Sequence, residues 1–365
     1  MTRRATVSVA LPCFNAQSFL PAALDSLLCQ TFSDFEILAL DDGSRDATPQ
    51  ILEAYAARDD RIRILRSEAN LGLIETLNRA VGEAGGEFIA RMDADDMAAP
   101  QRIERQLDAL TRRPEVAVVG SAARFVSEDG GRLRPRPVRC LEPGGARFTA
   151  LLATPLVHST LMARAAVMRA HRYGASADSL HTEDYEMFAR MLEAGVAFMN
   201  LDTPLQTQRV SRHGVSVSHE EIQIINFIAC ARRHLERTLG FLPDPGAHRV
   251  LVNRMDATTS ARDLVEGLRW LERVEQSFLA GEPAAAEEVG RAAGMQLVDI
   301  LLQAGLKGSP PVRLTAARLA VRYARRLRSS TARRYLATKL WPRAVPDSAL
   351  ALVRQRSFVS RQHDV

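Results

Sequence analysis

The sequence has few cysteines, and none of them form a metal-binding or redox motif. Four cysteines are scattered over 365 residues: Cys13, Cys29, Cys140 and Cys230. Zinc knuckles and redox pairs need two cysteines at close, regular spacing, and no pair here has it. The sequence therefore predicts buried, reduced thiols, which are typical of a cytoplasmic protein.

Long hydrophobic runs are also missing. No stretch approaches the roughly 18–20 apolar residues that cross a bilayer. The N-terminus has two arginines, but Pro12 and Asn15 interrupt its short apolar run, so it is a poor match to a signal peptide. We expect no transmembrane helix and a cytoplasmic location, at most peripheral on the inner face of the membrane.

Acidic residues are absent from one long C-terminal segment. Between Ile300 and Pro346 there is no Asp or Glu, whereas 11 Lys or Arg residues occur. Such a segment attracts anionic partners. Two interpretations stay open, a helix lying on an anionic membrane surface and a solvated helix packed on the protein. Five apolar residues there have the spacing of one helix face: Leu314, Ala317, Val321, Ala324 and Leu327.

Common nucleotide-binding signatures are missing too. No GxGxxG follows the first apolar strand, which counts against NAD or FAD, and no GxxxxGK[ST] occurs, which excludes a P-loop nucleotidase. Aromatic residues make up only 5% of the chain. They are not interleaved with the basic residues of the C-terminal segment, so we expect no nucleic-acid partner.

Strands and helices alternate over the first 120 residues. Apolar, strand-like runs are separated by segments with helical spacing. The strands are expected at 6–11, 35–40, 61–65, 87–91 and 116–120, and the helices at 17–30, 47–58, 73–84 and 100–112. This pattern predicts an α/β fold with a Rossmann-like, mostly parallel sheet that is covered by helices on both faces.

The pattern loosens after residue 120. We expect a Gly-Gly hairpin within 125–138, strands at 158–164, 196–201 and 205–210, and a helix at 182–195. From residue 219 the chain is helical and rich in Arg. The predicted organisation is an α/β domain over 1–218 and a helical C-terminal region over 219–365.

Polar motifs follow three of the expected strands: "PCFN", "DDGS" and "MDADD". Ligands of such sheets lie at the carboxyl ends of the strands, where these motifs meet. Asp93 and Asp95 lie two residues apart, so both could reach one cation, and Mg²⁺ typically binds one or two carboxylates plus substrate phosphates. The alternative is a solvated acidic turn before a helix.

Two stretches resemble the family 2 glycosyltransferases, which have the GT-A fold. They are "VSVALPCFNAQSFLPAALDSLLCQTFSDFEILALDDGSRDAT" and "NLGLIETLNRAVGEAGGEFIARMDADDMAAPQRI", and the resemblance covers roughly residues 5–215. It implies an enzyme that moves a sugar, with inversion, from a nucleotide-diphosphate sugar to an acceptor hydroxyl. The commonest donor of the family carries uridine diphosphate. Mg²⁺ or Mn²⁺ is the implied cofactor, and a glycan or lipid-linked molecule is the implied acceptor.

The resemblance also implies roles on the donor side. The nucleoside is expected to contact Pro12, Phe14 and Asp42. Asp93 is expected at the ribose or a metal-bound water and Asp95 at the metal, while Asp96 supports the turn. Arg91 is expected to pair with the carboxylates or the diphosphate. Arg209 and His213, with Arg212 beside them, are expected near the diphosphate, and His213 is a further candidate metal ligand.

On the acceptor side, the resemblance implies that Asp184 is the general base. Glu183 is expected to orient the acceptor or to raise the pKa of the base, because like charges lie side by side. His158 is a candidate for the acceptor pocket. Two other interpretations stay open, a sugar nucleotidyltransferase and a non-catalytic binding module with the same fold.

Overall fold

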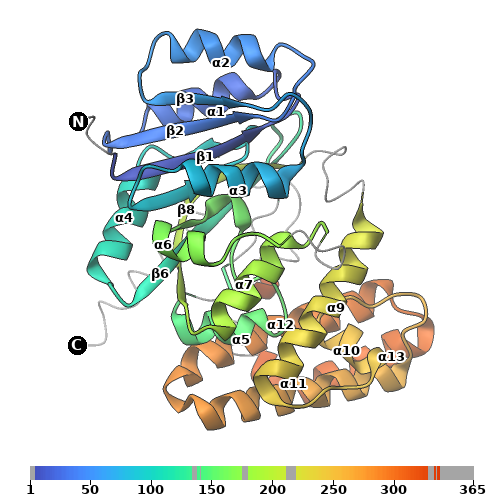
Figure 1. Cartoon of the computed structure of the whole chain (residues 1–365). Coiled ribbons are helices and arrows are strands. Elements are labelled where there is room, and N and C mark those ends of the chain that lie inside the picture. Colours follow the sequence, from blue (N-terminus) through green and yellow to red (C-terminus); the bar gives the residue numbers. More distant parts are fainter. Residues whose placement is uncertain are drawn as a thin grey trace, which may run out of the picture.

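The computed structural model describes residues 5–133, 138–139, 141–174, 180–210, 219–327, 333 and 335–337. Within this part, eight strands form one sheet in the order β3-β2-β1-β4-β7-β6-β8-β5 (Figure 1). The strands are β1 Val7–Cys13, β2 Phe35–Asp41, β3 Ile62–Arg66, β4 Phe88–Arg91, β5 Met97–Ala98, β6 Val116–Ser127, β7 Met162–Arg164 and β8 Ala197–Val210.

The sheet is mixed but mostly parallel, as the sequence predicts. β3, β2, β1 and β4 are parallel neighbours, and β6 is parallel to β8. β7 is antiparallel to both β4 and β6, and the short β5 is antiparallel to β8. Parallel neighbours share a carboxyl edge, so the loops after β1, β2 and β4 meet at one edge of the sheet.

Side chains alternate between the two faces along each strand, and each face has its own helices. Val9 and Ile37 pack on one face beneath α1 Leu20–Leu28, α2 Thr48–Ala56 and α4 Arg102–Arg112. Ala10 and Leu38 pack on the other face. The helices there are α3 Leu73–Glu83, α6 Ala165–Ala170 and α7 Glu183–Glu193. The strands are therefore buried on both sides, which explains their continuous apolar sequences.

Several expected boundaries are wrong, and prolines explain two of them. The helix expected from residue 17 begins at Leu20, which places Pro21 in the first turn, where its missing N–H costs no hydrogen bond. The helix expected from Pro100 begins at Arg102. The two strands expected at 196–201 and 205–210 are one strand, β8, whose pairing with β6 shifts register next to Pro204.

Two further elements differ from the sequence prediction. The strand expected over 158–164 begins with a 3₁₀ helix, η1 His158–Thr160, and only Met162–Arg164 pairs as β7. The helix α5 Pro143–Ala150 was not expected. The Gly-Gly hairpin is present in short form, because Val126 bridges Arg132 and the Ser127 N–H donates to the Gly131 carbonyl oxygen.

The C-terminal helices pack beneath the sheet domain (Figure 1). They are α9 Glu220–Leu239, α10 Pro245–Leu251, α11 Ala261–Gly281, α12 Ala286–Lys307, α13 Pro310–Arg322 and α14 Ala324–Leu327. Phe148 of α5 is buried in the same apolar cluster as Leu268 of α11 and Leu297 of α12. The helical extension is confirmed, while the boundary at residue 218 stays a prediction. In the described part of the chain, no helix is long and apolar enough to cross a membrane.

Candidate active site

The loops after β1 and β2 are joined by hydrogen bonds. The Asn15 N–H donates to Ser44 Oγ (3.0 Å), and the Arg45 N–H donates to Asn15 Oδ1 (2.9 Å). Asn15 has φ +47°, a left-handed conformation that Asn adopts more readily than most residues. Pro12 lies partly buried within β1, and the Phe14 side chain is 48% exposed at the edge of the sheet. Phe14 is therefore accessible to a planar ligand, as the predicted nucleoside contact requires.

The carboxylates of the loop after β2 are held by backbone amides. Both oxygens of Asp42 accept hydrogen bonds, from the N–H groups of Leu71 (2.9 Å) and Gly72 (3.0 Å). Gly43 has φ +72°, and a Cβ there would lie 2.6 Å from the carbonyl carbon of Ala69. Only glycine therefore suits this turn. The buried Asp42 holds the loop before α3 in place, and its predicted contact with a nucleoside stays a prediction.

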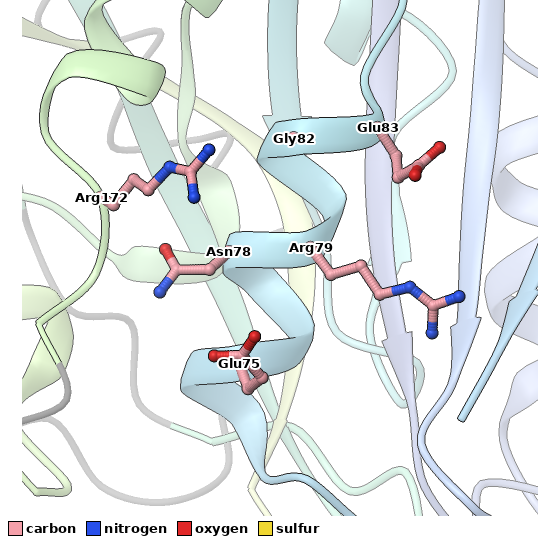
Figure 2. Close-up of a pocket in the computed structure, with 6 residues that line it drawn as sticks. All are labelled: Glu75, Asn78, Arg79, Gly82, Glu83 and Arg172. Carbon is pink, nitrogen blue, oxygen red and sulfur yellow. The ribbon is translucent and has the colours of Figure 1, made fainter. Parts of the chain in front are cut away.

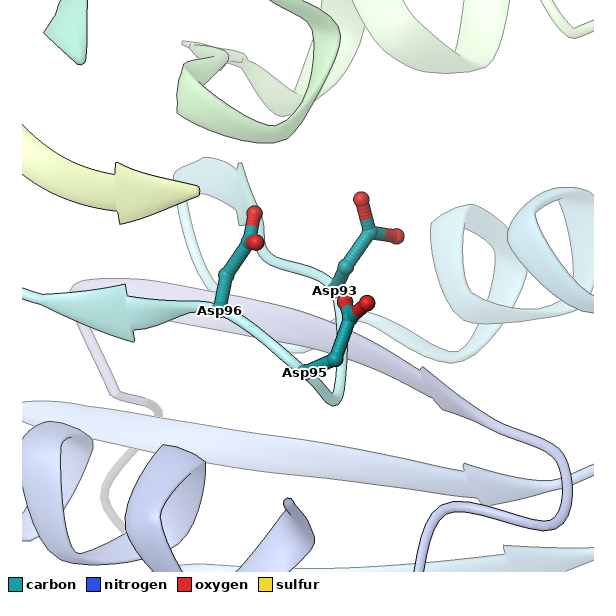
Figure 3. Close-up of side chains that lie close together, drawn as sticks. All are labelled: Asp93, Asp95 and Asp96. Atoms are coloured by element: carbon teal, nitrogen blue, oxygen red, sulfur yellow. The ribbon is translucent and has the colours of Figure 1, made fainter. Parts of the chain in front are cut away.

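Three carboxylates gather in the loop after β4 (Figure 3). One oxygen from each of Asp93, Asp95 and Asp96 lies within 4.8 Å of the others. Arg91 pairs with Asp93 through two hydrogen bonds, and one of them joins Nη1 to Oδ2 at 2.9 Å. Oxygen atoms at this spacing suit a hard divalent cation, so the residues present fit Mg²⁺ or Mn²⁺.

Asp96 is the most buried of the three carboxylates and is held by β8. It accepts from Gln206 Nε2 (2.6 Å) and from the Arg209 N–H (3.0 Å). Burial and the charges of Asp93 and Asp95 raise its pKa to about 7. Asp96 therefore ties the acidic loop to β8, which agrees with the supporting position expected from the sequence.

Asp95 is the open member of the group. Among the described residues, no hydrogen-bond donor or cation on another side chain contacts its carboxylate. Burial and the nearby charge of Asp93 raise its pKa to about 6. A bound cation would oppose that effect, because it favours the charged carboxylate.

Two of the three like charges in this loop are already compensated by the protein itself. Arg91 already neutralises Asp93, and β8 already satisfies Asp96. The guanidinium of Arg91 is itself nearly buried, with 5% of its side chain exposed. Arg91 thus belongs to the support of the carboxylates, one of the two roles expected for it, while a contact with nucleotide stays a prediction.

Arg102 completes this buried support and was not identified from the sequence. It is 1% exposed, and its Nη2 donates to the backbone oxygens of Arg91 and Ser159 (3.1 Å to Ser159). It therefore joins the end of β4 to η1. Its buried position could not be recognised from the sequence, because arginines on helices with one apolar face usually lie at the surface.

The predicted base lies at the start of α7. Asp184 Oδ1 accepts from the Tyr185 N–H (2.7 Å), and Glu183 precedes it. Burial and the Asp184 charge raise the pKa of Glu183 to about 7, and burial raises the pKa of Asp184. The charge of Asp93 adds to both shifts and that of Arg91 opposes them. The acidic loop and the first turn of α7 therefore share one electrostatic environment.

His158 belongs to a buried pair rather than to the surface. Its Nε2 lies 2.8 Å from the Tyr173 hydroxyl oxygen, and burial together with the Arg91 charge holds its pKa well below the usual value. The Asn78 side chain in turn fixes the backbone of Tyr173 through two hydrogen bonds of 3.0 Å. His158 is therefore neutral at pH 7, and its predicted place in the acceptor pocket stays a prediction. Tyr173 had no signal in the sequence.

Arg209 reaches the acidic loop from β8. Its Nη1 donates to the backbone oxygen of Glu128 (2.9 Å) and its Nε to that of Asp95 (3.4 Å). Its guanidinium carbon lies 4.3 Å from the centre of the Phe19 ring. These contacts hold the acidic loop against the hairpin, and the predicted contact with a diphosphate stays a prediction. His213 and Arg212 lie outside the described residues.

A separate hollow of about 410 Å³ lies along the outer side of α3 (Figure 2). Two of its charged side chains already have partners. Glu83 pairs with Arg63, and Arg79 donates to the Arg66 backbone oxygen (2.8 Å). Its lining includes none of the predicted site residues. The candidate active site is therefore the acidic edge of the sheet, not this hollow.

Comparisons with known proteins agree with this geometry. The family model described as "Glycosyl transferase family 2" matches residues 8–171. EpsE of Bacillus subtilis (strain 168), which is named as a glycosyltransferase, is 32% identical over 205 residues, or 56% of this chain and 72% of EpsE. The chain belongs to glycosyl transferase family 2. This glycosyltransferase is therefore an enzyme of the class that the resemblance implied, and not a sugar nucleotidyltransferase or a non-catalytic module.

Solved structures support the fold of this family 2 glycosyltransferase. Staphylococcus aureus TarS 1–349 in complex with UDP-GlcNAc has a TM-score of 0.53 at 19% identity, covering 87% of this chain and 92% of TarS 1–349. The mannosyltransferase PcManGT of Pyrobaculum calidifontis, in complex with GDP-Man and Mn²⁺, has a TM-score of 0.51 at 18% identity, covering 92% and 86%. At such identities the likeness establishes the GT-A fold alone.

Proposed function

We propose that this glycosyltransferase moves a sugar, with inversion, from a nucleotide-diphosphate sugar to an acceptor hydroxyl. The observation that carries the proposal is the open Asp95 carboxylate beside the Arg91–Asp93 pair. The charges of Arg91 and Asp93 also act on the carboxylate of Asp184, in the first turn of α7. The uridine and guanosine donors bound by TarS and PcManGT support a nucleotide sugar as donor, and a uridine diphosphate sugar is our first choice.

The donor binds along the carboxyl edge of the sheet in this proposal. Phe14 stacks on the base beside Pro12, and Asp42 reaches the nucleoside while keeping its amide contacts, since each carboxylate oxygen has two lone pairs. Asp95 is the main metal ligand, Asp93 contacts the metal or the ribose, and His213 is a further proposed ligand. When bound, Mg²⁺ or Mn²⁺ neutralises negative charge that develops on the diphosphate leaving group.

The acceptor meets the donor at the first turn of α7. Asp184 accepts the proton of the acceptor hydroxyl while that oxygen attacks the anomeric carbon. The bond to the nucleoside diphosphate breaks on the opposite face, so the new glycosidic bond has the inverted configuration. The raised pKa values of Asp184 and Glu183 suit proton transfer near neutral pH, because they bring the base closer to the working pH. Glu183 orients the acceptor. Arg209 lies near the diphosphate, and His158 lines the acceptor pocket.

The proposed acceptor is a glycan or a lipid-linked molecule of surface polysaccharide or glycoconjugate synthesis. Similarity to chondroitin synthase of Escherichia coli, at 25% identity over 234 residues, supports a polysaccharide product. We place the enzyme in the cytoplasm, with the catalytic domain over 1–218 and contact with the membrane through the basic region over 219–365. The acid-free segment that begins at Ile300 supports this contact.

A thermal-shift screen of nucleotide sugars, with and without Mn²⁺, tests the proposal. One donor should raise the melting temperature, and Mn²⁺ should increase that rise, because a ligand that binds only the folded state stabilises it. The responding donor is then supplied with candidate acceptors, and release of nucleoside diphosphate is measured. If no nucleotide sugar shifts the melting temperature in either condition, the proposed donor class is wrong.

A further inference from the structure

The outer face of α13 is apolar and uncovered. Leu314 is 56% exposed and Val321 is 77% exposed, and Leu306, at the end of α12, is 73% exposed. At 3.6 residues per turn, Leu314 and Val321 lie about 20° apart around the helix. They are therefore neighbours on one stripe. Two other residues expected on the same face, Ala324 and Leu327, lie in α14, and Leu327 packs against the buried core.

The opposite face of α13 supplies the packing. Val312, Ala316 and Leu319 are buried in the cluster that also contains Leu268 and Leu297. The helix therefore packs on the protein through this inner face, and Leu314 and Val321 lie outside the buried cluster. An exposed apolar stripe on a helix that is already anchored indicates a surface for another partner.

Cationic side chains lie beside the stripe without partners. Arg318, Arg322 and Arg325 are exposed, and none of them forms an ion pair within the described ranges. Arg322 contacts only the ring of Tyr323. By contrast, Arg326 turns inward and pairs with Glu275 (2.7 Å). Arg318, Arg322 and Arg325 thus lie beside the stripe, while the exposed Arg313, farther around α13, donates to the Gly308 backbone oxygen (2.8 Å).

We propose that this outer face of α13 docks on an anionic lipid bilayer. Leu314 and Val321 enter the interface between headgroups and acyl chains, and Arg318, Arg322 and Arg325 contact lipid phosphates. In Figure 1, α13 lies in the helical region, away from the sheet. Arginine heads around an apolar stripe, with no acidic residue on the segment, match the charge of such a surface. The inference deepens the membrane contact of the proposed function.

Vesicle flotation of the full chain tests the docking. One set of vesicles is phosphatidylcholine alone, and the other has about one third phosphatidylglycerol, which supplies the negative surface. We expect binding at least about tenfold tighter to the anionic vesicles, falling as salt rises from about 0.1 to about 0.5 M. Equal binding to both vesicles, or binding to neither, would overturn the proposal.

Two double variants locate the surface. Leu314→Ser with Val321→Ser, and Arg318→Gln with Arg325→Gln, should each weaken binding to anionic vesicles about tenfold or more. Arg58→Gln with Arg105→Gln is the matched control, because it removes two exposed arginines from the sheet domain. If the control pair weakens binding as much as the α13 pairs, a diffuse charge effect replaces the proposed surface.

Two readouts separate this inference from the proposed function. All four substituted residues, three in α13 and Arg325 in α14, are exposed, so donor binding in the thermal-shift assay should be unchanged. Loss of vesicle binding with retained donor binding supports the docking surface alone. A chain that self-associates without lipid, and loses this with Leu314→Ser and Val321→Ser, would show that a second copy covers the face and would contradict the membrane proposal.

Discussion

The loops after β2 and β4 both place adjacent carboxylates at one edge of the sheet, but they hold these charges differently. In the first loop, Asp42 accepts from two backbone amides and Asp41 accepts from the Ser44 N–H (3.1 Å). In the second, Arg91 pairs with Asp93, and no side chain in the described ranges donates to the Asp95 carboxylate. Neighbouring acids are therefore not equivalent, and our proposal assigns the metal to Asp95.

The largest expected effect is a loss of turnover, and it concerns Asp184 in the first turn of α7. Asp184→Asn removes the proposed base and keeps the shape of the side chain. Turnover should fall about 10²- to 10⁴-fold, the usual contribution of a positioned base. Donor binding, measured by thermal shift, should be retained. Asp202→Asn, at an exposed position of β8, is the matched control. Unchanged turnover in Asp184→Asn would remove the base assignment.

The pH dependence of turnover by the wild-type enzyme tests the roles of Glu183 and Asp184. The pKa of Glu183 is raised to about 7 and that of Asp184 is also raised, so both carboxyls bind protons as the pH falls. A base acts only when it is deprotonated. Turnover should therefore fall about tenfold per pH unit below the pKa of Asp184, which burial raises above the ordinary value of an aspartate. A rate that falls only below about pH 4, where an ordinary aspartate titrates, would contradict this account.

Substitutions in the loops after β2 and β4 should differ in how much they lower the free energy of unfolding. Asp42→Asn replaces one oxygen of a buried carboxylate, and leaves one partly buried amide, of Leu71 or Gly72, without its acceptor. The free energy of unfolding should fall by about 1–3 kcal/mol. Asp95→Asn should cost less than about 0.5 kcal/mol at pH 7, because it removes repulsion with Asp93 and breaks no side-chain hydrogen bond. Urea denaturation of both variants measures the difference, and equal losses would contradict the comparison.

A loss of stability no larger than that of Asp42→Asn is expected at the turn of the first loop. Gly43→Ala puts a Cβ within 2.6 Å of the Ala69 backbone at φ +72°. The loss should be about 1–2 kcal/mol in urea denaturation, since the loop has to shift. Gly130 is the control, because it also has a positive φ but a Cβ there would meet no atom within 4 Å. A Gly43→Ala loss no greater than that of Gly130→Ala would show that the close approach is unimportant.

The fold could be predicted from the sequence where local patterns decide it. Apolar strands and helices alternate over the first 120 residues, and the observed elements follow that pattern closely. The deviations come from tertiary pairing. β8 is continuous because β6 pairs along it on both sides of Pro204, and α5 is stabilised by Phe148 in the helical cluster. Both interactions join residues that are far apart in the sequence, so neither can be recognised from a short stretch of it.

The candidate site shows the same limit. Asp93 and Asp95 could be placed at the edge of the sheet because they follow a predicted strand, and Asp184 is proposed from the family resemblance. The partners that distinguish them could not be predicted. Gln206, which donates a hydrogen bond to Asp96, lies 110 residues away in the sequence. Tyr173, which is hydrogen-bonded to His158, lies between α6 and α7. Which carboxylate is free depends on these contacts, and they exist only in the folded chain.

The most direct test is Mn²⁺ binding, measured by calorimetry for the wild type, Asp95→Asn and Asp42→Asn. The responding nucleotide sugar is present at a concentration that saturates each variant, because Asp42 is itself a proposed nucleoside contact. Asp95→Asn should bind Mn²⁺ about 10- to 100-fold more weakly, since it loses the open carboxylate ligand. Asp42→Asn should keep wild-type Mn²⁺ affinity, although it is less stable. If Asp42→Asn loses the metal and Asp95→Asn keeps it, the free carboxylate is not the ligand and the account is wrong.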